Sequence, residues 1–147
     1  MNSLTYIFPL ITILSLSSFT FAAKSTSIAT FDTSYDDTSL SLSTVTCSNG
    51  ENGLMTKNYN TIADLPTPNV AGSPTVKAWN DPNCGACYAL TYNNKTVNVL
   101  AIDSAIGEFN VALKVLNDLT NGHGQEFGNV EVVYEQVQAT KCGMPAK

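Results

Sequence analysis

The stretch YALTYNNKTVNVLAID, residues 88–103, decides the fold class. Two runs rich in β-branched and aromatic residues, 88–92 and 96–103, flank Asn93-Asn94, which is a typical turn dipeptide. This pattern predicts a β-hairpin. The second run contains VNVLAI, which is too apolar for a strand with one face in water, so we expect it to lie at the centre of a β-sheet.

The chain before the hairpin alternates short β-rich runs with turn signals. Residues around 28–31 and 40–46 predict two strands joined by a loop that contains an Asp-Asp pair. The Gly- and Asn-rich segment 47–61 leaves room for little more than one helical turn, near 54–57. Residues 62–83 are interrupted by prolines, and we predict that they are mostly loop.

The chain after the hairpin predicts one helix and one long strand. Asn110 is a favourable N-cap for a helix over 111–119, and Asn121-Gly122 is a typical C-terminal stop. The apolar residues of this helix fall at i, i+3, i+4 and i+7: Ala112, Val115, Leu116 and Leu119. Residues 129–140 are rich in valine and predict a closing strand.

The charge composition excludes several classes of partner. The chain has 147 residues, with twelve acids and seven basic residues, all of them lysine, for a net charge of −5. Nucleic acids and anionic membranes both require a cationic surface, and bidentate phosphate recognition favours arginine. We therefore expect no nucleic-acid or membrane partner, whereas a neutral polysaccharide is compatible with this composition.

The N-terminal segment predicts export. LTYIFPLITILSLSSFTFAA, residues 4–23, is strongly apolar, ends in small residues and is followed by Lys24. We interpret residues 1–23 as a secretory signal peptide and residues 24–147 as one domain. The alternative is an uncleaved membrane anchor, but Pro9 and several Ser and Thr residues dilute the apolar run.

Four cysteines follow the predicted signal: Cys47, Cys84, Cys87 and Cys142. An even number of cysteines in an oxidising compartment predicts two disulfides, for which the sequence alone allows three connectivities. A redox CxxC motif at Cys84 and Cys87 is the alternative. It requires a low-pKa thiolate at a helix N-terminus, and the segment after Cys87 is instead typical of a strand.

Asn94-Lys95-Thr96 is an N-glycosylation sequon in the predicted hairpin turn. A position at the tip of a hairpin is accessible to a glycan, and Asn94 is therefore a candidate modification site.

The sequence predicts no metal and no cofactor. His123 is the only histidine and lies between two glycines, so a zinc site would need cysteines that we expect to be oxidised, or acids alone. A Ser-His-Asp relay through His123 is also disfavoured, because no Gly-x-Ser-x-Gly motif surrounds a serine.

Paired carboxylates would indicate a glycosidase, because such an enzyme needs one protonated and one ionised acid. Asp103 ends the predicted central strand, and burial favours the neutral form of a carboxyl group. The alternative is an aspartate that caps the following turn. Candidate second acids lie in loop-like segments: Asp32, Asp36, Asp37 and Asp81.

The aromatic residues allow two interpretations. The C–H faces of a pyranose ring pack on aromatic faces, so exposed rings form a platform for sugars. Core packing is the alternative, since a domain of this size needs most of its aromatic residues inside. The candidates are Trp79, Tyr35, Tyr59, Tyr88 and Tyr92.

Taken together, these residues follow one pattern over nearly the whole of residues 24–147. The sequence resembles the cerato-platanin family of small secreted fungal proteins. The matching segments are Tyr35-Asp36, VTCSNG (45–50), WNDPNCGAC (79–87), VNVLAID (97–103), Phe109-Asn110 and the tail around Cys142.

The resemblance implies a mainly β fold, a six-stranded double-psi β-barrel related to the first domain of expansins, with short peripheral helices. It implies the disulfides Cys47–Cys84 and Cys87–Cys142. It also implies binding of chitin and N-acetylglucosamine oligomers, expansin-like loosening of cellulose without appreciable hydrolysis, elicitation of plant defence, and self-assembly at interfaces.

The sequence departs from the family pattern in two places. Many relatives carry a histidine where this chain has Ser104, directly after Asp103. Relatives also often hold further aromatic residues in the segment that corresponds to 57–76, where this chain offers Tyr59. Stacking of sugars on that segment is therefore expected to be weaker here.

We predict a secreted, monomeric, non-enzymatic protein of the extracellular space or fungal cell wall that binds polysaccharide in a shallow groove. The expected carbohydrate-binding residues are Tyr35, Asp36, Asn80, Asp103 and Asn110. One rival is a glycosidase that uses Asp103 with a second acid. Another is an effector whose main partner is a plant receptor.

Overall fold

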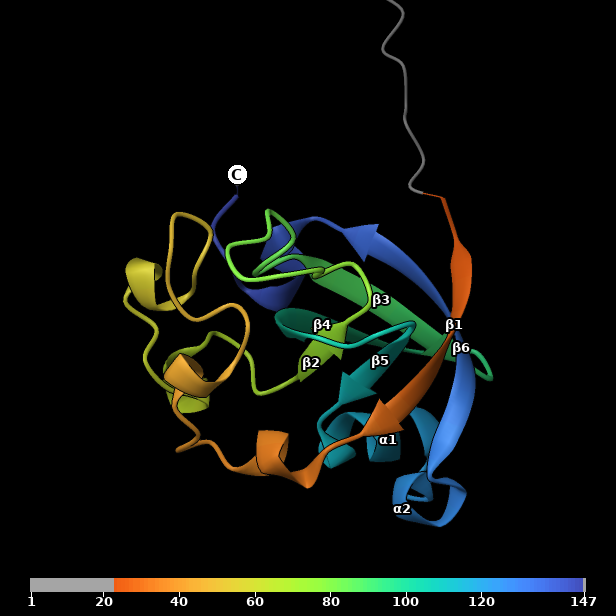
Figure 1. Cartoon of the computed structure of the whole chain (residues 1–147). Helices are drawn as coiled ribbons and strands as arrows, with labels where there is room; N and C mark the ends of the chain where they lie inside the picture. Colours follow the sequence, from red (N-terminus) through yellow and green to blue (C-terminus); the bar gives the residue numbers. More distant parts are fainter. Residues whose placement is uncertain (1–22, 147) are drawn as a thin grey trace, which may run out of the picture.

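A computed structural model describes residues 23–146, and these residues form a closed six-stranded β-barrel (Figure 1). The strand order around the barrel is β1-β5-β2-β4-β3-β6, and β6 pairs with β1 to close it. The strands are β1 Ser25–Phe31, β2 Val70–Ser73, β3 Cys87–Tyr92, β4 Lys95–Ser104, β5 Glu108–Val111 and β6 Asn129–Val137. The six-stranded barrel expected from the resemblance is thus confirmed.

The predicted hairpin is formed by β3 and β4, in a register that runs from Cys87 opposite Leu100 to Tyr92 opposite Lys95. Asn93 and Asn94 form its turn with φ values of 45° and 64°, because a two-residue hairpin loop that matches the strand twist needs left-handed backbone. Residues 99–102 of β4 are fully buried. On its other edge β4 pairs in parallel with β2, so the apolar strand is central, as predicted.

The barrel interior is packed with aromatic and aliphatic side chains. Tyr88 and Phe109 are fully buried, with ring centroids 5.4 Å apart, and Tyr134 lies 4.9 Å from Phe109 in an edge-on arrangement. These rings come from β3, β5 and β6, which are far apart in sequence. Their tilted contacts are the geometry that aromatic quadrupoles favour, and they join opposite walls of the barrel.

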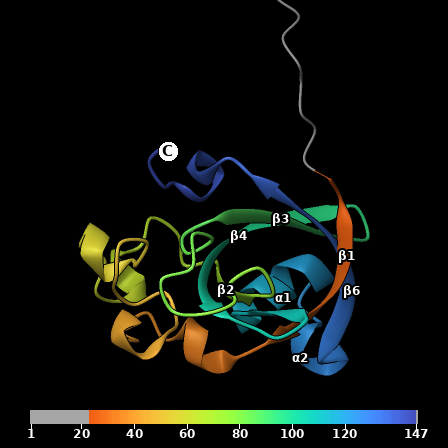
Figure 2. The same ribbon diagram turned by 45° about the horizontal axis from the view of Figure 1, so that its top comes forward.

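Two α-helices, α1 Leu113–Thr120 and α2 Gly124–Phe127, pack outside the strands (Figure 2). The helix predicted over 111–119 exists, but it begins later than predicted and α2 was not predicted. Asn121 ends α1 in a left-handed conformation with φ 57°, which confirms the predicted stop.

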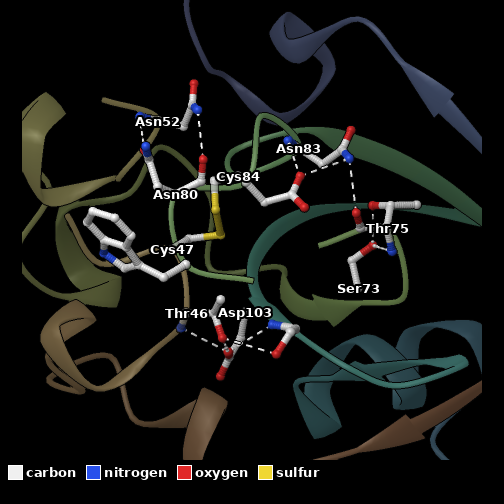
Figure 3. The surroundings of a disulfide bond; sticks show 12 residues. Thr46, Cys47, Asn52, Ser73, Thr75, Asn80, Asn83, Cys84 and Asp103 are labelled. Carbon is white, nitrogen blue, oxygen red and sulfur yellow. Dashed lines mark hydrogen bonds between the residues drawn. A yellow bond between two sulfur atoms is a disulfide. The ribbon is translucent and has the colours of Figure 1, made fainter. Parts of the chain in front are cut away.

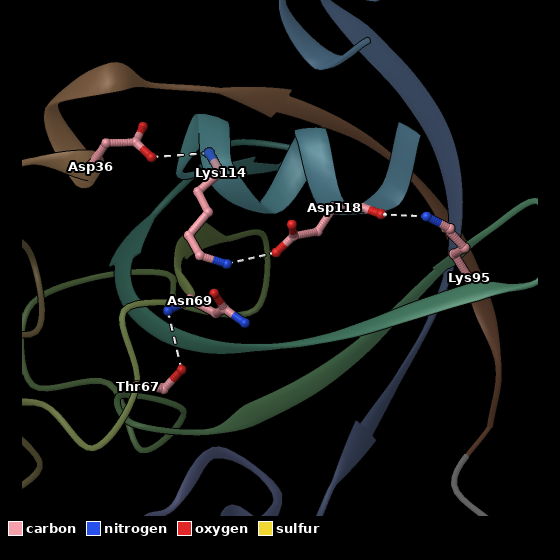
Figure 4. Close-up of polar contacts among 6 residues, drawn as sticks. All are labelled: Asp36, Thr67, Asn69, Lys95, Lys114 and Asp118. Atoms are coloured by element: carbon pink, nitrogen blue, oxygen red, sulfur yellow. Dashed lines mark hydrogen bonds and ion pairs between the residues drawn. The ribbon is translucent and has the colours of Figure 1, made fainter. Parts of the chain in front are cut away.

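The predicted N-cap role of Asn110 is wrong. Asn110 lies in β5, and the N-cap residue of α1 is Ala112, which has no side-chain acceptor. Asp36 supplies the acceptors instead, since its carboxylate oxygens accept hydrogen bonds from the amides of Leu113 at 2.8 Å and Lys114 at 2.9 Å. Figure 4 shows the bond from the Lys114 amide. A carboxylate at this end of a helix also interacts favourably with the helix dipole.

Short 3₁₀ helices fill the long connection between β1 and β2. They are η1 Thr33–Asp36, η2 Leu42–Thr44, η3 Met55–Lys57 and η4 Ile62–Asp64, and a fifth, η5 Ala139–Cys142, follows β6. The helical turn predicted near 54–57 is confirmed by η3.

The strand predicted at 40–46 is wrong, because this segment forms η2 and contributes only one β-bridge, Ser41 with Thr61. Ser41 accepts a hydrogen bond from the Ser43 amide through its side chain, and its carbonyl accepts one from the Thr44 hydroxyl. Such local bonds compete with strand pairing. Residues 62–83 are mostly loop as predicted, but they also contain β2.

Both predicted disulfides are present. Cys47 and Cys84 have Cα atoms 5.3 Å apart, and Cys87 and Cys142 have Cα atoms 5.8 Å apart. The bonds link residues 37 and 55 positions apart, and closing loops of this length stabilises the fold by about 4 kcal/mol each in the chain-entropy model. The redox interpretation of the CxxC segment is therefore wrong, since its two cysteines belong to different bonds.

The predicted signal peptide, residues 1–23, lies outside the described residues except for Ala23, and it stays a prediction. Among residues 23–146 there is no helix with the length and apolar character needed to span a bilayer.

Replacing Asp36 with alanine is expected to lower the free energy of unfolding by about 1 kcal/mol, because the first amides of α1 lose their acceptor. Asp36→Asn keeps one acceptor oxygen and should lose less. Urea denaturation followed by circular dichroism measures both changes. Equal stability of Asp36→Ala and the wild type would contradict the capping role.

Candidate functional site

Asp103, near the end of β4, is the centre of a hydrogen-bonded cluster (Figure 3). Its Oδ1 accepts hydrogen bonds from the Thr46 amide at 2.9 Å, the Thr46 hydroxyl and the Ser104 amide at 2.8 Å. Its Oδ2 accepts one from the Tyr35 hydroxyl at 3.0 Å. The half-buried carboxylate therefore ties together three segments that are distant in sequence.

Tyr35 is the donor that is most deeply buried in this cluster, with 6% of its surface exposed. Burial is the main cause that raises the pKa of its phenol well above the ordinary value of 10, and the neighbouring Asp103 carboxylate raises it further. The phenol therefore stays protonated at physiological pH and keeps donating to Asp103.

Strand register brings Asp103 and Asn110 onto one row of the barrel. Gly72 of β2 is the partner both of Asp103 in β4 and of Asn110 in β5, and Asn110 is in turn the partner of Thr30 in β1. Two strand spacings separate Asp103 from Asn110, or about 10 Å. A Cβ on Gly72 would lie 3.2 Å from the Ser104 carbonyl oxygen and 3.3 Å from the Ala105 Cβ, so the glycine allows the end of β4 to pass close to β2.

At the Asn110 end of this row, side chains form a small hydrogen-bonded group around Thr30. The Thr30 hydroxyl lies 3.2 Å from Asn110 Oδ1 and 3.1 Å from a Glu108 carboxylate oxygen. Asn110 and Glu108 are both half-buried. Asn110 is thus a partly accessible amide beside a hydroxyl, which is a suitable arrangement for exchanging hydrogen bonds with a polar ligand.

Asn80 is held tightly in the loop between β2 and β3. Its side-chain oxygen accepts a hydrogen bond from the Asn52 amide at 2.8 Å, and its carbonyl accepts one from the Asn52 side chain at 2.9 Å. Asn80 has a left-handed φ of 62°. Figure 3 shows this pair on one side of the Cys47–Cys84 disulfide and Asp103 on the other.

Trp79, which precedes Asn80, has 61% of its surface exposed. Its indole Nε1 donates a hydrogen bond to Asn49 Oδ1 at 2.7 Å. The tyrosines differ: Tyr35 and Tyr88 are buried in the core, while Tyr59 and Tyr92 are partly buried against it. The core interpretation thus fits the tyrosines, whereas Trp79 is the surface aromatic of the candidate group.

The residues brought together around the disulfide include several that the sequence analysis missed: Thr46, Asn49, Asn52 and Gly72. The Asn-Gly pairs at 49–50 and 52–53 were interpreted only as turns. They place asparagine side chains opposite Trp79 and Asn80. Glycine at position 50 is required, because a Cβ there would lie 2.7 Å from Asn80 Oδ1.

The candidate second acids are already engaged as hydrogen-bond acceptors. Asp32 accepts from the Ser34 amide at 2.8 Å, and Asp36 caps α1. Hydrogen bonds from the Ser39 hydroxyl and amide lower the pKa of Asp37, and those from the Asn83 and Lys77 amides lower the pKa of Asp81. The lowered pKa keeps Asp37 and Asp81 ionised at neutral pH, so neither can supply the protonated member of a catalytic pair.

His123 lies far from this cluster in the fold, at the start of α2. Its Nδ1 is 2.9 Å from a Glu126 carboxylate oxygen, and its ring stacks on Phe127 at 5.6 Å. Across residues 23–146, no three or more side chains of the metal-ligating types lie close enough together to hold an ion. His123 is thus placed as an exposed surface residue of a short helix.

A hollow of about 310 Å³ lies away from Asp103, between residues 85–87 and 136–140. It adjoins the Cys87–Cys142 disulfide and is lined largely by backbone and by small or amide side chains. Asp103, Gly72, Asn110 and Asn80 do not line it, so a ligand that contacts Asp103 would occupy a different surface.

The sequence matches known proteins over most of its length. A family model described as Cerato-platanin matches residues 27–144. The heat-stable 19 kDa antigen of Coccidioides immitis is 50% identical over 121 residues, which cover 82% of this chain and 83% of that protein. Cerato-platanin of Ceratocystis fimbriata f. sp. platani is 38% identical over 106 residues, covering 70% and 77% of the two chains.

Solved structures agree with the sequence match. Cerato-platanin 3 from M. perniciosa superposes with a TM-score of 0.79 at 35% identity, over 82% of this chain and all of that chain. An expansin from Clavibacter michiganensis superposes with a TM-score of 0.54 at 18% identity, over 85% of this chain and 53% of that one. The second similarity concerns the fold alone, and it confirms the expected relation to expansin double-psi barrels.

The Tyr35–Asp103 bond predicts a pH dependence of stability. An unfolded tyrosine loses its proton near pH 10, whereas folded Tyr35 keeps it, so its contribution is complete below pH 10 and is lost as the pH rises above that value. The slope is at most about 1.4 kcal/mol per pH unit. Tyr35→Phe removes this part of the dependence, while Tyr88, whose pKa is also raised by burial, keeps its own part.

Urea denaturation of the wild type and of Tyr35→Phe between pH 8 and about pH 11 checks this. The wild type should lose stability more steeply above pH 10. Parallel curves for the two proteins would contradict a raised Tyr35 pKa.

Asn94 is exposed at the tip of the β3–β4 hairpin, and its turn projects from the barrel. Expression through a eukaryotic secretory pathway should therefore give a glycoprotein whose electrophoretic mobility changes on treatment with peptide N-glycosidase F. Asn94→Gln and Thr96→Ala should lack the change, while Thr96→Ser keeps the sequon and the glycan. A wild type that the glycosidase does not affect would contradict this prediction.

Proposed function

Because the chain belongs to the cerato-platanin family, we propose that it is a secreted protein of the extracellular space or cell wall that binds chitin oligomers or cellulose and loosens the polysaccharide without hydrolysis. The observation that carries this proposal is the row of Asp103, Gly72 and Asn110 beside the disulfide-linked Asn80 loop. Together, the row and the loop combine fixed acceptors, amides and the exposed aromatic residue Trp79, which are the groups that neutral sugars bind.

Loosening by such a surface is a physical exchange of hydrogen bonds. Adjacent glycan chains are joined by hydroxyl and amide hydrogen bonds, and protein groups of the same kind replace them one at a time. Each exchange contributes about 1 kcal/mol net, so a few contacts give affinities of about micromolar to millimolar. The two disulfides and the closed barrel hold these groups in place before binding, which reduces the ordering cost.

Elicitation of plant defence is the second activity that we propose. A solved structure described as the fungal elicitor Cerato-Platanin superposes with a TM-score of 0.70 at 36% identity, over 78% of this chain and 95% of that chain. A plant receptor is then a partner of this protein in addition to polysaccharide. We propose that the protein acts as a monomer that can also self-assemble at interfaces.

A glycosidase that uses Asp103 is the enzymatic alternative. Hydrolysis requires a second carboxyl group opposite the first, with one of the pair protonated. Asp103 accepts hydrogen bonds from Tyr35 and Thr46, and the loop acids bind amides elsewhere. The existing hydrogen bonds of these carboxylates support the non-hydrolytic function.

Titration of the protein with chitin hexaose, followed by NMR, tests the binding. Amide shifts are expected around Asp103, Asn110 and Asn80, and Asp103→Asn should weaken the affinity about tenfold, because it alters the acceptor that orders Tyr35 and Thr46. Asp118→Asn, the same change at an exposed position of α1, is the matched control and should bind normally. Absence of shifts with both chitin and cellulose oligomers would contradict polysaccharide binding and favour the receptor alone.

A reducing-end assay on insoluble chitin and cellulose tests the absence of hydrolysis. No soluble sugar is expected from the wild type. Sugar release that disappears in Asp103→Asn would overturn the non-hydrolytic proposal.

A further inference from the structure

We propose that Trp79 is a preformed aromatic platform that packs against the face of a pyranose ring of the bound glycan. It extends the binding surface beyond the polar row formed by Asp103, Gly72 and Asn110. This inference rests on the proposed polysaccharide binding and identifies a specific residue for it. The resemblance assigned no role to this side chain in binding.

The first observation is the exposure of Trp79. It is the only tryptophan of the chain, and 61% of its surface is exposed, although a tryptophan gains more from burial than most side chains. Single exposed apolar residues are common, and Ile106 and Phe127 are also exposed here. Exposure alone therefore does not identify a platform, and the way the ring is held is the deciding evidence.

The second observation is that the indole is fixed without being buried. Its Nε1 donates to Asn49 Oδ1 at 2.7 Å, so the polar edge of the ring is satisfied within the protein. The Gly50 backbone lies directly beside the ring, since a Cβ at that position would be 3.0 Å from Trp79 Cζ2. A side chain that is ordered in the free protein loses little further freedom when a ligand packs against it.

The backbone under the ring is equally constrained. Asn80 is tied to Asn52 by two hydrogen bonds, and the Cys47–Cys84 disulfide joins the two loops that carry Trp79 and Asn49. These contacts hold the loop in place and leave most of the indole exposed, so the ring stays accessible to a ligand.

The third observation is the short path from Trp79 to the polar row. The Thr46 amide donates to Asp103, and Asn49, which holds the indole, follows Thr46 by three residues. Three residues span at most about 11 Å. The indole and the carboxylate are thus held by the two ends of one short segment, at a separation that a short oligosaccharide can span.

The ligand chemistry follows from this pairing. A β-1,4-linked chain of glucose or N-acetylglucosamine has equatorial hydroxyl and amide groups around the ring edges and C–H bonds on the ring faces. The edges match the fixed amides and acceptors of the row, and the C–H faces match the electron-rich face of an indole. A surface with both features binds an uncharged chain of such sugars without requiring cationic residues.

The experiment uses Trp79 as its own reporter. Because the chain contains no second tryptophan, a change of tryptophan emission during titration with chitin hexaose comes from Trp79. We expect a saturable change whose dissociation constant equals that obtained from NMR shifts near Asp103. Trp79→Ala should weaken the NMR affinity about five- to tenfold, while Trp79→Phe, which keeps an aromatic face, should stay within about threefold of the wild type.

Two matched controls locate the effect. Asn49→Ala, which removes the acceptor of the indole, should weaken binding about two- to threefold, and Asn49→Asp, which keeps an acceptor oxygen, should not. Phe127→Ala removes an exposed aromatic ring on α2, at another part of the barrel, and should bind as the wild type does. Thermal melts of all variants verify folding.

The outcomes separate this inference from the proposed function. Wild-type binding that Trp79→Ala leaves unchanged would overturn the platform while polysaccharide binding stands. An equal loss in Phe127→Ala would also overturn it, because the effect would not be specific to Trp79. Absence of oligomer binding to the wild type would overturn both proposals.

Discussion

The burial of β4 is the constraint on which the rest of the structure depends. Its apolar residues 99–102 are fully buried, as is typical of a central strand. The strand pairs with β3 on one edge and with β2 on the other. The parallel partner β2 follows a long connection, and that connection contacts the end of β4, where the Cys47 amide donates to the Ile102 carbonyl at 3.1 Å. The loops that carry the candidate site are therefore gathered at this end by the demands of the core.

Asp103 links the end of the buried strand β4 to the loops around it. An acceptor at the end of a buried strand must be satisfied, and it is satisfied by Tyr35 from η1 and Thr46 from the segment before Cys47. The same segment leads through the disulfide to the Trp79 loop. One carboxylate thus aligns loops that have little regular structure of their own, which explains how a small domain with short helices holds polar side chains in fixed positions.

The elements that the sequence predicted well are those with a strong local signal. The hairpin had alternating and apolar runs around Asn93-Asn94, and the closing strand was rich in valine, so β3, β4 and β6 were found. β2 has only four residues, contains Gly72 and lies between Pro68 and Pro74, and it is a strand because β4 and β5 pair with it. Such tertiary pairing leaves no periodic pattern in the sequence.

The site was predictable only in part for a similar reason. Asp103 could be singled out because it ends an apolar run, whereas no sequence signal showed that Asp36 caps a helix that begins 77 residues away. Asn49 and Asn52 were interpreted as turn residues, because their partners, Trp79 and Asn80, lie about 30 positions further along the chain. The disulfide pairing came from the resemblance, since spacing alone allowed three connectivities.

The opposing needs of rigidity and weak binding can both be met by this architecture. A protein that loosens a polysaccharide must place several hydrogen-bonding groups at once, and it must also release them, because tight binding would leave it fixed at one position. The disulfides and the hydrogen bonds of Asp103 supply the order, while each hydrogen bond exchanged with a neutral chain contributes only about 1 kcal/mol. A single exposed indole adds contact area without adding charge, so affinity can rise by a modest amount while dissociation stays fast.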